Sequence, residues 1–193
     1  SSDAALLMPC ALPQLGIPAM PGLEAKCAAL AVRGVLAGDT FEARQQDALA
    51  KLRAGGWTDA ALRAGSISVA FDRWRAVAVG YASAYGRYPH DAHPCGYRYS
   101  AMNPDPSVRA ATMAERAAWV ADASGIPPGA GVGIIDPQAP ADMGLTGLQC
   151  LRALWTADSA DARRVRKGIE ETRAGLPRKG LPVVVIHGTD DGL

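Results

Sequence analysis

Apolar side chains recur every three or four residues in three segments near the start of the chain, which is the spacing of an amphipathic helix. The pattern predicts helices over residues 23–37 and 41–54 and a short third helix from Asp59 through Leu62, stopped at Gly65, with Thr40 and Thr58 as N-caps of the second and third. A glycine follows each segment, as is common after the end of a helix. The chain therefore begins as a helical protein.

Other segments have a less regular pattern. Four prolines within residues 6–22 exclude a long helix there. Residues 67–85 mix apolar and small side chains, so helix and strand patterns each fit part of the segment. An ordered loop is expected over residues 85–99 and a long, glycine- and proline-rich loop over residues 126–147.

Three more helices are predicted in the second half of the chain. The first covers residues 108–123, and the second begins with Thr146 as its N-cap and runs through Leu154. The third covers residues 159–174 and carries many charged side chains, which suit a solvated face. Helices thus dominate the chain up to about residue 178.

Residues 181–186, Leu-Pro-Val-Val-Val-Ile, form a short continuous apolar run. Such a run is typical of a strand buried on both faces of a parallel sheet, here near residues 182–187. A buried strand needs neighbouring strands and helices on both faces, and the preceding 180 residues offer almost no other strand of this type. We therefore expect the chain to be a fragment of a larger protein.

Composition and charge exclude some classes of partner. The chain has 193 residues and a formal net charge of +1, with 20 Lys and Arg against 19 Asp and Glu. Nucleic acids and acidic membranes are therefore not expected as partners, because clustered basic side chains bind phosphate groups. A membrane span is not expected either, because no apolar run approaches the roughly 20 residues that a spanning helix needs.

Four cysteines permit two disulfides in three connectivities, and no C-x-x-C pair indicates a zinc site. The sequence permits pairing but does not fix the connectivity. If a bridge forms, Cys95–Cys150 is the first choice, because it would fasten the loop over residues 85–99 to the helix that begins near Thr146, while Cys10 and Cys27 could close the proline-rich start of the chain. Disulfides fit a secreted or periplasmic protein better than a cytosolic one. Its signal peptide is expected outside this chain, which does not start with a basic and apolar leader.

The segment His90-Asp91-Ala92-His93-Pro94-Cys95 combines two imidazoles, a carboxylate and a thiol within six residues. These groups can bind zinc, which would make the chain a small zinc protein. The alternative, which we favour, is a polar loop held by a disulfide at Cys95, because a proline-stiffened run resists tetrahedral geometry. No cofactor is expected.

The predicted strand is followed directly by His187-Gly188-Thr189-Asp190-Asp191, which has the spacing H-G-x-x-D. This segment resembles the one that carries the acid of the catalytic triad in α/β-hydrolases. There a carboxylate at the end of a strand orients the imidazole of a histidine and stabilises its protonated form. By this spacing Asp191 is the acid and Asp190 the fallback, while His187 is a turn residue; the alternative is a solvated β-turn.

The other two triad members are not expected within these residues. The motif G-x-S-x-G, which surrounds the nucleophile, does not occur. Because α/β-hydrolases place serine, acid and histidine in that order, the serine is expected before residue 1 and the histidine after residue 193. The fold class is accordingly a fragment of an α/β-hydrolase, with a helical cap-like region at 1–178 and the acid-bearing part of an incomplete core at 179–193.

Five segments taken together are similar to one family of such enzymes, the D-(-)-3-hydroxybutyrate oligomer hydrolases. The resemblance is most specific from residue 81 onward and implies an exported serine esterase that hydrolyses 3-hydroxybutyrate oligomers, the dimer included, through an acyl-enzyme. Only Asp191 can be carried over as a catalytic residue. The segments are Tyr-Ala-Ser-Ala-Tyr-Gly-Arg-Tyr at 81–88, Pro-Cys-Gly-Tyr at 94–97, Ser-Gly-Ile-Pro-Pro at 124–128, Leu-Gln-Cys-Leu-Arg at 148–152 and Val-Ile-His-Gly-Thr-Asp-Asp-Gly-Leu at 185–193.

Aromatic side chains between residues 74 and 99 have two interpretations. Most are expected to pack in the core and loops, although rings at the mouth of a cleft would suit a short aliphatic polyester, with its methyl groups and ester carbonyls. These residues are Trp74, Tyr81, Tyr85, Tyr88, Tyr97 and Tyr99.

The partners implied are therefore a small ester substrate and the remainder of the hydrolase core, without which the chain is expected to be inactive. A free-standing, non-catalytic helical binding module is the alternative function. In either case, a strand without neighbours leaves backbone groups unpaired, so we expect poor solubility or self-association of the isolated chain.

Overall fold

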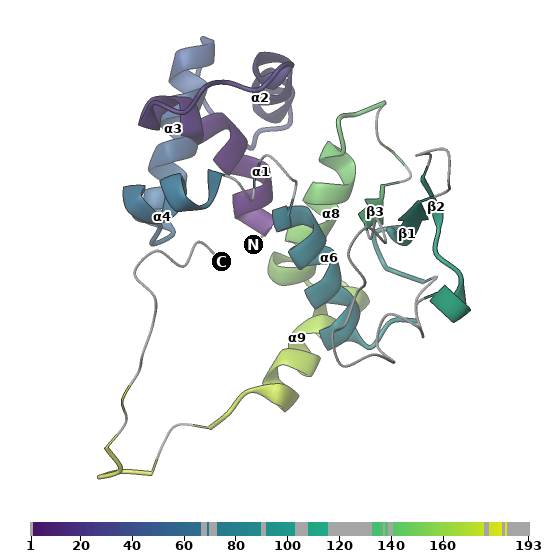
Figure 1. Ribbon diagram of the computed structural model, residues 1–193. Helices are drawn as coiled ribbons and strands as arrows, with labels where there is room; N and C mark the ends of the chain where they lie inside the picture. The colour runs from purple at the N-terminus through teal and green to yellow at the C-terminus, as the bar shows by residue number, and fades with distance from the viewer. Residues whose placement is uncertain are drawn as a thin grey trace. The chain divides into compact units, whose positions relative to one another are not determined.

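A computed structural model of the chain describes residues 2–66, 69, 73–89, 92–102, 108–115, 133–136, 138, 141–175, 178–182 and 184. The chain divides into two compact units, Ser1–Val77 with Ile169–Leu193, and Ala78–Gly168. The structure is mainly helical, as the sequence predicts (Figure 1). The division into these two units was not evident from the sequence.

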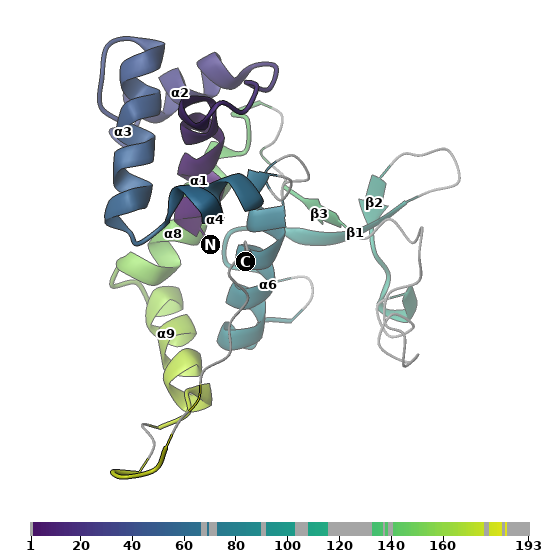
Figure 2. The same ribbon diagram turned by 60° about the vertical axis from the view of Figure 1, so that its left-hand side comes forward.

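Helices and one 3₁₀ turn form the first unit. Helix α1 packs against α3, and α2 lies beside α3 (Figure 2). The elements before residue 73 are α1 (Ser2–Ala11), η1 (Leu12–Leu15), α2 (Leu23–Val32), α3 (Phe41–Ala54) and α4 (Asp59–Ala64).

Helix α1 was not predicted, because its sequence has no polar stripe. Nearly all of its side chains are buried, with Leu6, Met8 and Cys10 fully enclosed. A helix that is buried on all sides shows no amphipathic period, and Pro9 inside it is a further signal against helix. A disulfide from Cys10 to Cys27 joins α1 to α2, and this is the pairing expected from the sequence.

The predicted caps of α3 and α4 are confirmed. The Thr40 hydroxyl accepts a hydrogen bond from the Ala43 amide at 3.1 Å, and the Thr58 hydroxyl accepts one from Ala61 at 3.2 Å. Helix α2 ends at Val32, earlier than the predicted end at residue 37. The reason is a left-handed turn at Gly34, after which the chain folds back to bury two apolar side chains, Val35 and Leu36.

The second unit contains a small antiparallel sheet, one whole helix and parts of two helices that also contribute to the first unit. Strand β1 (Arg98–Met102) lies between β2 (Val108–Ala110) and β3 (Gly133–Ile135), with Ser100 opposite Ala110 and Tyr99 opposite Ile134. The helices are α6 (Arg73–Gly86), α8 (Leu145–Thr156) and α9 (Ala160–Thr172).

The undecided segment 67–85 contains most of α6, so helix is the correct choice from residue 73 onward. The predicted start of α9 is confirmed, since the Ser159 hydroxyl accepts a hydrogen bond from the Ala162 amide. The proposed cap of α8 at Thr146 is wrong. Gly144, in the left-handed conformation, precedes α8, and the Asp142 carboxylate accepts hydrogen bonds from the Gly144 and Thr146 amides.

Two predictions are corrected around the sheet. The helix expected over residues 108–123 is wrong at its start, because residues 108–110 pair with β1 as strand β2. Residues 113–115 are helical, and the rest of that prediction lies outside the described residues. The loop expected over 126–147 contains β3 and the start of α8. Strands as short as β2 and β3 have too few residues for a local pattern, and their pairing with β1 decides their conformation.

The apolar strand expected near residues 182–187 is not formed at the positions that the structure describes. Leu181, Pro182 and Val184 are outside any strand and exposed, Val184 at 84%. The described residues place no parallel strand beside them, and a strand buried on both faces requires such neighbours. Among the described helices, none combines the length and apolar character needed to cross a membrane.

Candidate functional site

The predicted catalytic acid belongs to a turn that lies outside the described residues. This holds for Asp191, for its fallback Asp190 and for His187. The assignment of Asp191 as the acid therefore stays a prediction. The polar sites that the structure does describe belong to the second unit.

The segment at residues 90–95, which could have bound zinc, is organised around a disulfide. Cys95 and Cys150 are bonded to each other across 55 residues, which is the pairing expected from the sequence. The sulfur of Cys95 is thus not a free thiolate for zinc, and the described part of the chain contains no group of three or more metal-binding side chains. His90 and Asp91 lie outside the described residues. The structure favours the disulfide-held loop over the zinc site.

His93 is the buried centre of this loop. Its side chain is 7% exposed and lies between two tyrosine rings. The ring of Tyr97 meets it edge-on at 5.4 Å between centroids, and the ring of Tyr88 lies 6.5 Å away. We call His93, Tyr88 and Tyr97 the His93 cluster.

The hydrogen bonds of His93 define its tautomer. Nδ1 accepts the backbone N–H of Cys95 at 3.0 Å, so the proton of the neutral ring is on Nε2. Nε2 is buried and has no hydrogen-bond partner of normal geometry among the described residues. Burial lowers the pKa of His93 to about 4, although the nearby backbone of Val79 opposes this shift. His93 is therefore a neutral packing residue at neutral pH.

The side chains of Tyr97 and Asp136 both lie against Gly147 of α8. Both side chains are buried, and a Cβ placed on Gly147 would lie 2.3 Å from Oη of Tyr97 and 2.9 Å from Oδ2 of Asp136. A side chain at position 147 would collide with both groups. Sequence reasoning missed Asp136 and Gly147, because only the folded chain brings residues 97, 136 and 147 together.

The Tyr-Gly-Arg-Tyr segment at 85–88 fastens the end of α6 to α9. The Tyr88 hydroxyl donates a hydrogen bond to Oδ1 of Asp161 at 2.6 Å, and the guanidinium of Arg164 lies 4.3 Å from the centre of the Tyr88 ring. Arg164 also donates to the carbonyl oxygen of Arg87, a residue in the left-handed conformation. Burial, with the bond to Asp161, raises the pKa of Tyr88 to about 12, so the phenol stays protonated.

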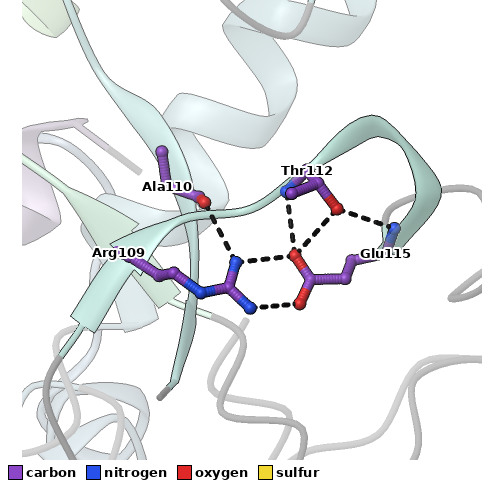
Figure 3. Close-up of polar contacts among 4 residues, drawn as sticks. All are labelled: Arg109, Ala110, Thr112 and Glu115. Atoms are coloured by element: carbon purple, nitrogen blue, oxygen red, sulfur yellow. Dashed lines mark hydrogen bonds and ion pairs between the residues drawn. The ribbon is translucent and has the colours of Figure 1, made fainter.

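Another polar site, around Arg109 and Glu115, joins β2 to the helical turn that follows it (Figure 3). Arg109 binds both carboxylate oxygens of Glu115, at 2.8 and 2.5 Å. Thr112 and Glu115 bond reciprocally, because the Thr112 amide donates to the carboxylate while the Glu115 amide donates to the Thr112 hydroxyl. The bond from Arg109, followed by the Thr112 amide, lowers the pKa of Glu115 to about 2. This is a capping box with an added ion pair, and its role is structural.

The aromatic side chains mostly pack, as expected. Trp74 and Tyr97 are buried, Tyr85, Tyr88 and Tyr99 are half-buried, and Tyr81 is 51% exposed. Trp74 meets Trp57 edge-to-face at 5.3 Å, and Tyr81 contacts Tyr85.

Comparison with known proteins links the chain to one family. Residues 17–193 match the model of a family described as 3HB-oligomer hydrolase. The chain is 32% identical to a D-(-)-3-hydroxybutyrate oligomer hydrolase of Paracidovorax citrulli (strain AAC00-1), over 91% of this chain and 27% of that protein. A protein of the same name from Azoarcus sp. (strain BH72) is 30% identical over 98% of this chain and 30% of its own length.

A third relative, the D-(-)-3-hydroxybutyrate oligomer hydrolase of Cupriavidus necator (strain ATCC 17699), is 29% identical over 87% of this chain and 26% of its own length. The chain thus spans 26–30% of the length of these curated relatives. No solved structure matches it.

Proposed function

Since the chain belongs to the 3HB-oligomer hydrolase family, we propose that it is part of an esterase that hydrolyses 3-hydroxybutyrate oligomers, the dimer included, to 3-hydroxybutyrate during polyhydroxybutyrate breakdown. The observation that carries this proposal is the family match over residues 17–193. The relatives named above support it, because each is named for hydrolysis of these oligomers.

In this proposal Asp191 is the acid of a serine-histidine-acid triad. Its carboxylate accepts the N–H of the catalytic histidine, which takes the serine proton while the serine oxygen attacks the ester carbonyl. The alcohol end of the oligomer leaves with that proton, and water then hydrolyses the acyl-enzyme. G-x-S-x-G is absent from these residues, so we assign the serine and the histidine to the part of the relatives that this chain does not span.

The helical residues 1–178 are proposed to form a cap-like region that shapes the substrate cleft of the hydrolase. The mainly helical structure is consistent with this role. By itself the region carries no nucleophile elbow, so we propose that the isolated chain is inactive.

A secreted or periplasmic location is also proposed. The two disulfides, Cys10–Cys27 and Cys95–Cys150, support it, because such bonds persist in oxidising compartments and are rare in the reducing cytosol.

The test is hydrolysis of the 3-hydroxybutyrate dimer by the natural protein at its full length. Asp191→Asn should lower kcat on the order of 10³- to 10⁴-fold with little change in stability, because the histidine loses its orienting carboxylate. Asp190→Asn is the matched control and should retain most activity. The release of 3-hydroxybutyrate is measured for all three proteins.

Two results would contradict the proposal in different ways. A large loss with Asp190→Asn and none with Asp191→Asn would show that the wrong carboxylate was chosen. A full-length protein that releases no 3-hydroxybutyrate from the dimer or from longer oligomers would overturn the esterase function and favour a binding module.

A further inference from the structure

The first unit contains an open groove of about 620 Å³ between the start of α2 and the first turns of α3. Figure 2 shows these two helices side by side. The volume is within the range of small-molecule binding sites in proteins. The groove is lined by Ala19, Met20, Gly22, Leu23, Glu24, Ala25, Ala28, Phe41 and Arg44.

Most of this lining is apolar, with three larger side chains and several alanines. Leu23 is buried, Phe41 is half-buried, and Met20 is 45% exposed. Apolar side chains around a concave surface favour a ligand with methyl or methylene groups. A small molecule with a short branched aliphatic chain would cover this surface.

Arg44 is one of the two charged residues that line the groove, and two hydrogen bonds hold its guanidinium. Its Nε donates to the carbonyl of Gly38 at 3.0 Å, and one Nη donates to the carbonyl of Asp39 at 3.1 Å. These bonds hold the guanidinium in place but leave its charge uncompensated, because both acceptors are neutral carbonyls. No carboxylate pairs with Arg44 among the ion pairs of the described residues. A guanidinium has five N–H donors, so others remain for a ligand carboxylate.

Glu24 limits the charge of the ligand. It lines the same groove from the first turn of α2 and is exposed. Its carboxylate repels a second negative charge, so the groove favours a monoanion over a phosphate ester or a dicarboxylate. The combination is an apolar groove with one oriented cation and one anion.

We propose that this groove binds the acid end of a linear 3-hydroxybutyrate oligomer, with its terminal carboxylate on Arg44 and its methyl groups against Leu23 and Phe41. The identity of the ligand rests on the proposed function, whereas the site rests on the groove. A linear oligomer carries one carboxylate and one methyl group per unit, which matches the charge and the lining. The groove is a binding site separate from the predicted acid at Asp191 and performs no bond cleavage.

The experiment uses the full-length protein and a trimer analogue in which amide bonds replace the ester bonds. The analogue keeps the carboxylate, the carbonyls and the methyl groups but resists hydrolysis, so binding can be measured by calorimetry without turnover. Arg44→Gln should weaken binding about 10- to 100-fold, the usual value of hydrogen bonds to a charged group. Arg44→Lys should recover part of the loss. The methyl ester of the analogue should bind wild-type protein as weakly as the acid binds Arg44→Gln.

Two further variants separate binding from folding. Ala28→Leu narrows the groove without touching the Arg44 charge and should also weaken binding, while Arg63→Gln, on α4 and outside the groove lining, is the matched control. Thermal unfolding of each variant is compared with wild type. Equal affinity of wild type, Arg44→Gln and Ala28→Leu would overturn the proposal.

The binding experiment and the esterase assay can fail separately, so their results distinguish the groove from the proposed function. Hydrolysis of the dimer with no effect of Arg44→Gln on binding would retain the esterase and remove the groove. Binding that depends on Arg44, in a protein that hydrolyses no oligomer, would retain the site and remove the function. Hydroxyl-radical footprinting of Met20 adds a check, because protection without ligand, together with no binding, would show that another part of the protein covers the groove.

Discussion

The two units of the chain are stabilised by different kinds of contact. The first relies on apolar helix packing, on hydroxyl caps at Thr40 and Thr58 and on a disulfide that spans 17 residues. The second relies on the His93 cluster, on the bond between Tyr88 and Asp161 and on a disulfide that spans 55 residues. In the first unit the two caps are local in sequence, although α1 packs against α3, a distant segment. In the second unit the His93 cluster is local, but the disulfide and the Tyr88–Asp161 bond join residues 55 and 73 positions apart. The second unit should therefore be the more sensitive to loss of a single tertiary contact.

The largest loss of stability is expected from removal of the disulfides. Replacement of both Cys95 and Cys150 by Ala should destabilise the protein by about 4 kcal/mol, and replacement of Cys10 and Cys27 by about 3 kcal/mol, because the longer closed loop restricts the unfolded chain more. Unfolding in denaturant, followed for both double variants, measures this order. A greater loss for the pair at 10 and 27 would contradict the comparison.

A close approach of backbones predicts the next effect. A Cβ on Gly168 would lie 1.9 Å from the carbonyl oxygen of Tyr85, an atom that cannot move without shifting α6. Gly168→Ala should thus destabilise by about 3 kcal/mol or more. The matched control is Gly175→Ala, since nothing lies within 4 Å of a Cβ there. Thermal unfolding of both variants measures the difference, and equal stability would show that α6 and α9 do not approach so closely.

The third effect depends on pH. Burial holds the pKa of His93 at about 4 in the folded state, below the ordinary 6.5. The unfolded chain therefore takes up a proton first as the pH falls. The stabilising contribution is complete above pH 6.5 and decreases between pH 6.5 and 4, by at most about 3 kcal/mol.

His93→Asn tests this sign, because its side-chain oxygen can accept the Cys95 amide without titrating. The free energy of unfolding of wild type should fall more steeply than that of the variant between pH 6.5 and 4.5. Parallel curves for the two proteins would mean that protonation of His93 costs the folded state nothing.

Local signals predicted much of the first unit. Thr40 and Thr58 were identified as caps because a hydroxyl just before an apolar periodic segment bonds the free amides of the first turn. Helix α1 was not predicted, because a helix buried on all sides has no periodic alternation of apolar and polar residues. The same limit applies to β2, whose pairing with β1 is invisible in three residues of sequence.

The polar sites show a similar division. The sequence indicated that residues 85–99 form an ordered loop held at Cys95, and it offered Cys95–Cys150 as the first choice among the possible pairings, which is the bridge that the structure contains. It did not indicate that Asp142 replaces Thr146 at the start of α8, or that Asp136 meets Gly147. A short carboxylate and a hydroxyl are equally good cap residues, so only the path of the chain before α8 selects between them.

By itself, the sequence determined the helical character of the chain, the caps of two helices and the family, because each depends on neighbouring residues or on motifs read in order. The tertiary structure alone decided that His93 is buried and neutral, that Gly168 lies against Tyr85, and that Arg44 lines an apolar groove. The physical reason is that burial and the charge around a side chain depend on segments far away in sequence, and these are brought together only when the chain folds.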